Sequence, residues 1–214
     1  MQKLIRLLGI IFSLLPIYSL AHPHAFIEMR TKPIIEEQKL TGFSMQWILD
    51  EASSAAVLYD LAFVKDNEKE LQKFIDDMIQ NVVNEHYFSY FFDKKGDKIK
   101  YSAQPKNYGL KSNGAQVLYY FDFFLTKPQN LSNNKFELST YDPTYYVSMY
   151  YDKDNKEESA VDFSKLPQHC KGNIVEPQVD QKLQEYAASL DRNQRGEDSS
   201  LGVIFAQKVV IQCQ

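Results

Sequence analysis

Alternating hydrophobic and polar positions dominate the region after the first apolar run. Residues 25–31 alternate imperfectly, and residues 40–49 alternate throughout. The apolar face of the second segment is formed by Phe43, Met45 and Trp47. A period of two residues is typical of a strand with one buried face. Polar residues 36–39 separate the two segments, so the pattern predicts an amino-terminal β-hairpin.

Helical periodicity follows the hairpin. Asp50 is a natural amino-terminal cap for an alanine-rich helix over residues 51–61. Residues 67–84 then repeat apolar side chains at steps of three and four, which predicts a second helix with one apolar face. The members of that face are Leu71, Phe74, Ile75, Met78, Ile79, Val82 and Val83.

Short strands rich in aromatic residues make up much of the rest of the chain. The expected strands are 97–102, 108–110, 115–125, 135–140, 145–151, 172–176 and 208–213, with a short helix over 181–190. We therefore predict an α+β fold, with a central, mainly antiparallel sheet against the two helices. Charged residues from 152 onward suggest a main domain over 22–152 and a small carboxy-terminal subdomain over 153–214. The polar stretch 191–200 is expected to be flexible.

Residues 1–21 have the three zones of an export signal. The start is basic, residues 7–20 are mainly apolar, and the small residues Ser19 and Ala21 stand three and one positions before a cleavage point. The apolar run is interrupted and short for a membrane span of about 20 residues. We expect cleavage after Ala21 and a soluble periplasmic protein, with an uncleaved amino-terminal anchor as the alternative.

The composition narrows the class of function. The whole chain has a formal charge of −4, and loss of the signal removes two positive charges. A mildly acidic chain without basic tracts argues against nucleic acid as a partner. No glycine-rich nucleotide loop, nucleophile elbow or paired-carboxylate pattern occurs. We therefore expect no nucleotide cofactor and no enzymatic activity, whereas the acidity is compatible with handling cations.

The chain has two cysteines, Cys170 and Cys213. An even count in an exported protein predicts one disulfide. Closing a loop of about 44 residues would stabilise the fold by about 4 kcal/mol in the chain-entropy model. The alternative is a pair of thiolate metal ligands, with His169 as a neighbouring third ligand.

His22 and His24 flank Pro23 directly after the expected cleavage point. Side chains two residues apart on an extended chain point to the same side, and the residue before a proline favours extended geometry. Cleavage would add the amine of His22 as a third nitrogen. Imidazole donors suit zinc, copper and nickel. Because Pro23 has no amide proton, the square-planar copper or nickel mode that needs deprotonated amides at the second and third residues is excluded.

Carboxylates from other segments could complete such a site. Asp50 and Glu51 stand at the predicted corner between strand and helix, where a helix cap is the alternative interpretation. Asp142 precedes a proline, which is equally typical of an ordinary turn. The candidate metal ligands are therefore His22, His24, Asp50, Glu51 and Asp142.

Several motifs in order resemble a known family. They are residues 21–28 (AHPHAFIE), 47–52 (WILDEA), 141–147 (YDPTYYV) and the late cysteines. The combination is similar to a family of bacterial periplasmic proteins of unknown domain function, whose members are commonly encoded beside a nickel/cobalt/zinc-type inner-membrane permease. One similar member is the periplasmic partner in a two-protein zinc-uptake system. Many relatives carry a calcium-loop-like insert after the first helix, but residues 64–70 lack its glycine.

The resemblance implies metal binding by His22 and His24, with Asp50, Glu51 and Asp142 as additional candidates. The leading hypothesis is a periplasmic accessory protein that binds zinc, or else nickel or cobalt, and serves an inner-membrane permease. Two alternatives stay open. One is a copper site at the amino-terminal histidine that supports redox chemistry, and the other is a metal-free interaction module.

Overall fold

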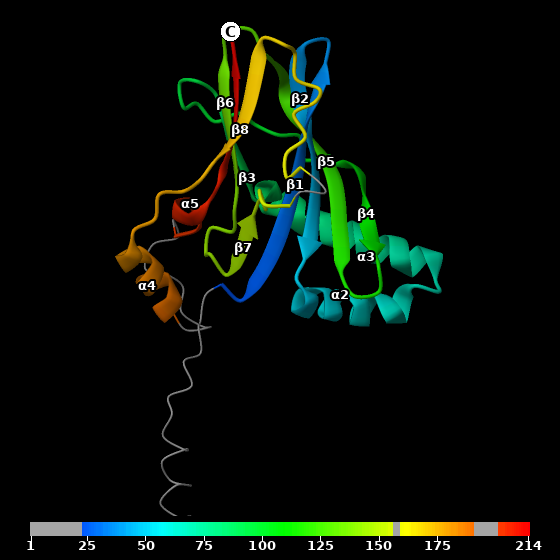
Figure 1. Ribbon diagram of the computed structural model, residues 1–214. Coiled ribbons are helices and arrows are strands. Elements are labelled where there is room, and N and C mark those ends of the chain that lie inside the picture. The colour runs from blue at the N-terminus through cyan, green and yellow to red at the C-terminus, as the bar shows by residue number, and fades with distance from the viewer. Residues whose placement is uncertain (1–22, 156–158, 191–200) are drawn as a thin grey trace, which may run out of the picture.

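The computed structural model describes residues 23–155, 159–190 and 201–214, and Figure 1 shows how their elements are arranged. The expected export signal, His22 and the polar stretch 191–200 lie outside the described residues. Within the described ranges, no helix is both long enough and apolar enough to cross a membrane.

The chain first forms the predicted β-hairpin. β1 (Ala25–Glu36) and β2 (Lys39–Leu49) pair antiparallel along most of their length. Glu37 and Gln38 connect them with φ values of 47° and 60°. Positive φ at both central residues of a two-residue turn matches the right-handed twist of the flanking strands. The hairpin prediction is confirmed, and β1 is one continuous strand.

Sheet A has the strand order β4-β5-β2-β1-β7. Its other strands are β4 (Lys106–Ser112), β5 (Val117–Asn130) and β7 (Val147–Tyr150). Neighbouring strands pair antiparallel except β1 and β7, which are parallel. The parallel pair sets Ala25 opposite Val147. The turn before β7 therefore lies next to the beginning of β1.

Sheet B is antiparallel and has the order β3-β6-β9-β8. Its strands are β3 (Ser89–Phe92), β6 (Lys135–Thr140), β8 (Cys170–Val175) and β9 (Lys208–Cys213). Cys170 stands opposite Cys213, and the two form the predicted disulfide. Since β9 lies between β6 and β8, strands on both sides of the predicted boundary at residue 153 share one sheet.

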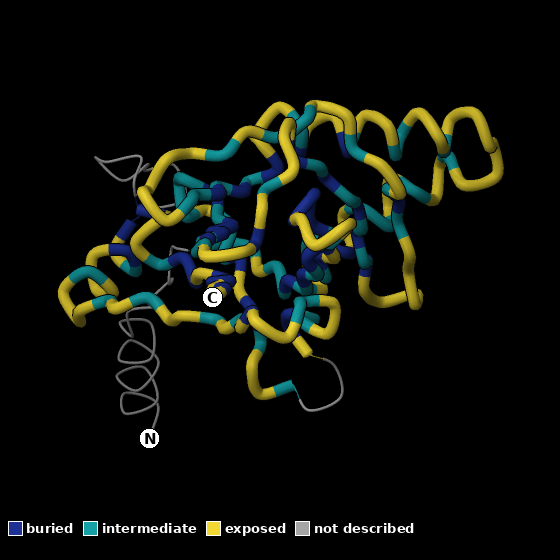
Figure 2. The backbone as a smooth tube through the Cα atoms, turned by 90° about the horizontal axis from the view of Figure 1, so that it is seen from above, coloured by how far each residue is buried: buried dark blue, intermediate teal, exposed yellow. Residues whose placement is uncertain are grey.

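The hydrophobic core lies between the two sheets. Phe43 of β2 meets Phe91 of β3 with ring centroids 5.1 Å apart, and Phe91 stacks on Phe136 of β6. Figure 2 shows buried positions concentrated in the middle of the molecule, whereas the outer parts of the helices are exposed. The α+β class with mainly antiparallel sheets is confirmed. Two packed sheets, however, replace the single central sheet that the sequence predicted.

The two helices after the hairpin differ in burial. α3 (Glu68–Asn84) places Ile79 and Val82 in the core, as its apolar period predicted. In α2 (Glu51–Val64), whose residues are all described, Ser54 is the buried one. Its hydroxyl bonds the backbone of both β2 and β5. α2 therefore attaches through hydrogen bonds, whereas the sequence predicted that both helices would cover a sheet face.

A small second core lies near the carboxyl end. α4 (Gln181–Ser189) agrees with the predicted helix, and α5 (Leu201–Phe205) was not predicted. Ala187, Leu190 and Leu201 pack together there, with Tyr145 and Phe205 against them. This cluster fastens both helices to the turn before β7.

Candidate metal site at the head of β1

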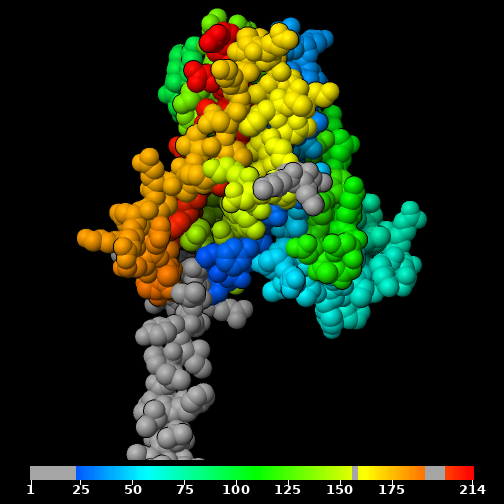
Figure 3. Space-filling model, viewed as in Figure 1, coloured from blue at the N-terminus to red at the C-terminus, as the bar shows by residue number. Residues whose placement is uncertain are grey.

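His24 is held in place at the head of β1. Its backbone N–H donates a hydrogen bond to the Tyr146 carbonyl oxygen at 2.9 Å, and the two rings lie 4.9 Å apart between centroids. Figure 3 shows the beginning of β1, in blue, at the lower surface of the molecule. The fold therefore positions this imidazole, as the sequence predicted. Its expected partner, His22, lies outside the described residues.

Asp50 ties the start of β1 to the start of α2. One carboxylate oxygen accepts a hydrogen bond from Ser53 N–H at 2.7 Å and caps the helix. The other accepts from Phe26 N–H at 2.6 Å, and Asp50 N–H donates to Phe26 O at 3.0 Å. Burial acts to raise the pKa of the Asp50 carboxyl, but these hydrogen bonds outweigh it and hold the pKa below its ordinary value. A fixed negative charge thus lies beside Phe26, two residues from His24.

Two further carboxylates gather with Asp50 around Tyr150. Glu28 stands opposite Tyr150 in the parallel pair of β1 and β7, and Asp152 follows β7. Burial, and then the charges of Glu28, Asp152 and Asp50, raise the pKa of the Tyr150 phenol. Carboxylates from three segments therefore act on one hydroxyl, next to the strand that follows His24.

Two other charged side chains adjust this local charge. Glu51 is exposed in the first turn of α2, where a carboxylate interacts favourably with the helix dipole. Arg30 places a guanidinium nitrogen 3.5 Å from a Glu28 oxygen and offsets part of the negative charge. The region is thus acidic near the beginning of β1 and partly neutralised farther along the strand.

Asp142 builds the turn that carries Tyr146. This side chain is 9% exposed, and its carboxylate accepts hydrogen bonds from the N–H and hydroxyl of Thr144, each at 2.9 Å, and from Val147 N–H at 3.0 Å. A carboxylate offers about four lone-pair positions, and these bonds use most of them. Asp142 therefore acts on His24 indirectly, because it shapes the turn to which His24 is bonded.

α5 packs against the same turn. Gly202 N–H donates a hydrogen bond to Pro143 O at 3.1 Å. A Cβ atom at Gly202 would collide with the backbone carbonyl of Asp142. The close approach of the helix therefore requires glycine at this position.

His169, Cys170 and Cys213 bring potential ligand atoms within 4.8 Å of one another. In the part of the chain that the structure describes, no other three such side chains converge as closely. The two sulfur atoms are bonded to each other, however, so they cannot serve as thiolate ligands while the disulfide is intact. The disulfide interpretation is confirmed, and His169 is exposed beside it.

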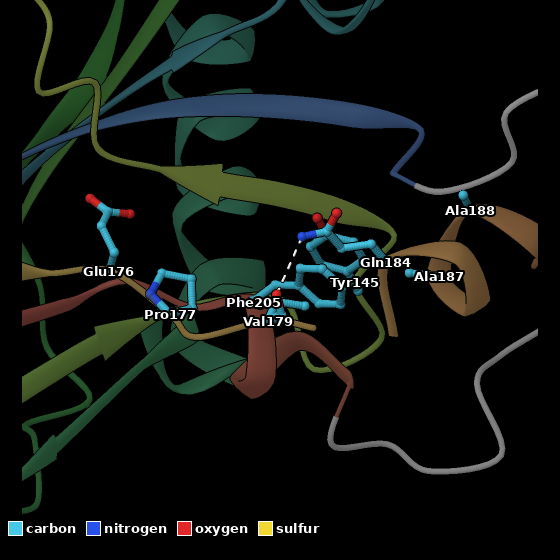
Figure 4. Close-up of a pocket in the computed structure, with 8 residues that line it drawn as sticks. All are labelled: Tyr145, Glu176, Pro177, Val179, Gln184, Ala187, Ala188 and Phe205. Atoms are coloured by element: carbon cyan, nitrogen blue, oxygen red, sulfur yellow. Dashed lines mark hydrogen bonds between the residues drawn. The ribbon is translucent and has the colours of Figure 1, made fainter. Parts of the chain in front are cut away.

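A cavity of about 420 Å³ lies between α4, α5 and the turn that holds Tyr145 (Figure 4). Tyr145 stacks on Phe205 with ring centroids 4.2 Å apart, and the Gln184 side chain donates to Val179 O at 3.4 Å. The cavity has one carboxylate in its wall, that of Glu176, which pairs with Lys153 and Gln207. Glu176 and Gln184 are thus already bonded to neighbouring groups. The described residues of the wall therefore present no open set of metal ligands.

The structure adds residues that the sequence did not single out. Glu28, Tyr146, Tyr150 and Asp152 all lie at or near the beginning of β1. Glu28 could have been found, because it follows His24 at an even spacing along one strand. The others come from a segment more than 100 residues away, whose parallel pairing with β1 has no local signal.

Comparisons with known proteins place the chain in a family. A family described as "Protein of unknown function (DUF1007)" matches residues 7–213. The chain belongs to the DUF1007 family. An uncharacterized protein from Haemophilus influenzae is 56% identical over 195 residues, which cover 91% of this DUF1007 chain and 92% of the relative. No solved structure matches the chain. Neither the family nor this relative has an assigned activity, so the similarity to a zinc-uptake protein stays a prediction.

Proposed function

We propose that this protein is a periplasmic metal-binding accessory of a zinc transport system, which captures the ion at the head of β1 and serves an inner-membrane permease. The observation that carries the proposal is the placement of His24. It is bonded to the turn before β7 and lies two residues from Phe26, to which Asp50 is bonded. A nitrogen donor and fixed carboxylates thus share one end of the molecule.

The surrounding charge favours a cation. Burial raises the pKa of Tyr150, and the charges of Glu28, Asp152 and Asp50 raise it further, so their negative potential extends over this region. A negative potential at a surface raises the local concentration of divalent cations. The carboxylates around Tyr150 do not converge on His24 as a closed set, so an ion there would draw further ligands from His22, its amine and side chains that turn towards it.

Zinc is the preferred ion. Imidazole nitrogens with a carboxylate and an open position are a common zinc donor set, and nickel, cobalt and copper are alternatives with the same ligands. A site built on two histidines of one short segment, His22 and His24, leaves part of the coordination sphere open. An open sphere suits an ion that is passed on rather than stored.

The transport role and the periplasmic location are supported by sequence features. Residues 1–21 read as an export signal, and the motifs at 21–28, 47–52 and 141–147 resemble proteins encoded beside metal permeases. The proposed partner, a membrane permease for nickel, cobalt or zinc, rests on these sequence features. The proposed ion binding rests on the geometry at His24.

The test of the binding part is a competitive zinc titration of protein that begins at His22, against a chromophoric chelator. His24→Ala should weaken zinc binding at least about tenfold, a loss of about 1.4 kcal/mol. His169→Ala is the matched control, since it removes an exposed histidine far along the chain and should leave the affinity unchanged. Equal zinc affinities for wild type and His24→Ala would contradict the assignment of His24 as a ligand.

The pH dependence and the cellular role give separate tests. Zinc affinity should fall as pH drops through about 6.5, because protonated imidazole cannot bind a metal. Deletion of the gene should lower zinc uptake in zinc-poor medium, and a copy with His24→Ala should fail to restore it. Restoration by that variant would contradict the transport role even if zinc binds in vitro.

A further inference from the structure

A second cavity, distinct from the His24 region, lies where α3 ends. It has a volume of about 330 Å³ and lies between Val83 of α3, the turn at His86 and Tyr87, and the segment 98–103. This volume is at the lower end of the range for small-molecule sites.

The cavity wall combines apolar and basic groups. Val83, Ile99 and Ala103 supply apolar surface, whereas Lys98 and Lys100 supply two ammonium groups. Of the nine described residues that line the cavity, none is acidic. In a chain with a formal charge of −4, such a concentration of basic side chains is a local feature and favours an anion.

The segment that carries the lysines is anchored on both sides. Ile99 N–H donates to Phe91 O of β3 at 2.8 Å, and Ser102 N–H donates to Phe124 O of β5 at 2.8 Å. The segment therefore bridges the edges of sheets B and A. In addition, the Lys98 ammonium lies 5.1 Å from the centroid of the Tyr90 ring. The basic groups thus project from a fixed backbone, which lowers the entropic cost of holding a ligand.

The opposite wall is a left-handed turn. His86, Tyr87 and Phe88 have φ values of 53°, 57° and 48°. Three successive non-glycine residues in this region are strained, and such strain is found where the surroundings hold it in place, often at functional sites. Here the Tyr87 hydroxyl donates to Ser102 O at 2.8 Å, so the two walls of the cavity are joined.

We propose that this cavity binds a small organic acid, with its carboxylate at Lys98 and Lys100 and its apolar body against Val83 and Ile99. The proposal does not depend on metal binding at His24. It requires both parts of the ligand, because the lysines recognise the charge and the apolar wall recognises the body.

The experiment is a titration of ¹⁵N-labelled protein (residues 22–214) with sodium benzoate, followed by amide chemical shifts. We expect saturable shifts in residues 98–103 and at His86, with a Kd of about 0.1–1 mM for a ligand of this size. Benzyl alcohol, which lacks the charge, and acetate, which lacks the body, should each bind at least about tenfold more weakly. Hexanoate replaces the ring by a chain and should bind as benzoate does.

Variants separate recognition from folding. Lys98→Ala combined with Lys100→Ala should weaken benzoate binding at least about tenfold. Lys94→Ala with Lys95→Ala is the matched control, because it removes the same charge from the neighbouring turn.

Several results would overturn the proposal. One is the absence of saturable shifts with both benzoate and hexanoate, and another is shifts located away from residues 98–103. A third is equal affinity in the two double-lysine variants. Unperturbed spectra of the free variants establish that each has folded, so a loss of binding then reports on the cavity itself.

Discussion

The Asp50 carboxylate accepts the backbone N–H of Phe26 at 2.6 Å, while the Asp50 N–H donates to the Phe26 carbonyl at 3.0 Å. This reciprocal pair closes the open end of the β-hairpin. The same carboxylate caps α2 through Ser53. One side chain therefore sets the direction of α2 and the path of β1, the strand that follows His24.

Asp50→Ala should lower the free energy of unfolding by about 1–3 kcal/mol, because the cap and the bond to Phe26 are lost together. Asp50→Asn keeps one acceptor oxygen but turns an amide NH2 towards the other backbone N–H, so it should lose about half of that amount or more. Urea unfolding of the three proteins measures the difference. A loss below about 0.5 kcal/mol for Asp50→Ala would contradict this role of the carboxylate.

Stability should fall in acid. Hydrogen bonds from Lys135 and Lys32 lower the pKa values of the Glu137 and Asp162 carboxyls, as backbone hydrogen bonds do for Asp50. A carboxyl with a lowered pKa in the folded state binds fewer protons there than in the unfolded state. Its contribution is therefore complete above the ordinary carboxyl range of about 4 and is lost as the pH falls through and below it.

The measurement is urea unfolding between pH 7 and pH 3. Asp162→Asn should flatten the decline below about pH 4, whereas Asp66→Asn, in the exposed loop between α2 and α3, should not. A free energy of unfolding that stays level or rises between pH 5 and pH 3 would contradict the assignment.

His86→Gly should stabilise the fold. His86 is exposed and has a φ of 53°, which costs an L-residue about 1–2 kcal/mol and costs glycine little. Glycine has more unfolded-state entropy, so the expected net gain is about 0.5–1 kcal/mol. Glu85→Gly, at a φ of −91°, is the neighbouring control and should destabilise by a similar amount. Thermal melting of both variants shows whether each change raises or lowers the stability of the fold.

Gly202→Ala should destabilise the protein by about 1–3 kcal/mol, because α5 must move away from the Asp142 carbonyl. In an unconstrained helix the same change would stabilise the protein by up to about 1 kcal/mol. The close contact and the intrinsic helix propensity therefore predict opposite signs for the change in the free energy of unfolding. Val203→Ala, at an exposed neighbouring position, should have a small effect. A rise in melting temperature for Gly202→Ala would refute the close contact.

Removal of the disulfide should cost about 2–4 kcal/mol, since Cys170 and Cys213 close a loop with a separation of 43 residues. Cys170→Ser with Cys213→Ser, compared with wild type in the presence and absence of dithiothreitol, measures this. The reductant should destabilise wild type and leave the double variant unchanged. A loss below about 0.5 kcal/mol would mean that strand pairing alone holds these ends together.

Local patterns were enough to predict many elements. β6 and β9 have the predicted bounds, and the hairpin and α3 follow periods of two and of three to four residues. The left-handed turn at residues 86–88 was missed because it contains no glycine or asparagine, the usual sequence signals for positive φ. This turn buries Tyr87, whose ring stacks on Phe121 and Phe123 of β5, and such long-range packing has no local sequence signal.

The sequence predicted only those residues of the candidate site that local patterns place. His24 and Asp50 stand at the ends of elements that local patterns define. The parallel pairing of β7 with β1, by contrast, joins segments more than 100 residues apart and fixes Tyr146 and Tyr150 beside them. Asp142 was named as a possible ligand because sequence spacing cannot distinguish a carboxylate that faces an ion from one that bonds its own turn.

The position of β9 between β6 and β8 has a consequence for the order of folding. Both neighbours of β9 precede it in the chain, so their inner edges have no partner until residues 208–213 arrive. Until then β6 and β8 each present an unpaired edge, and sheet B stays open to pairing with a wrong strand.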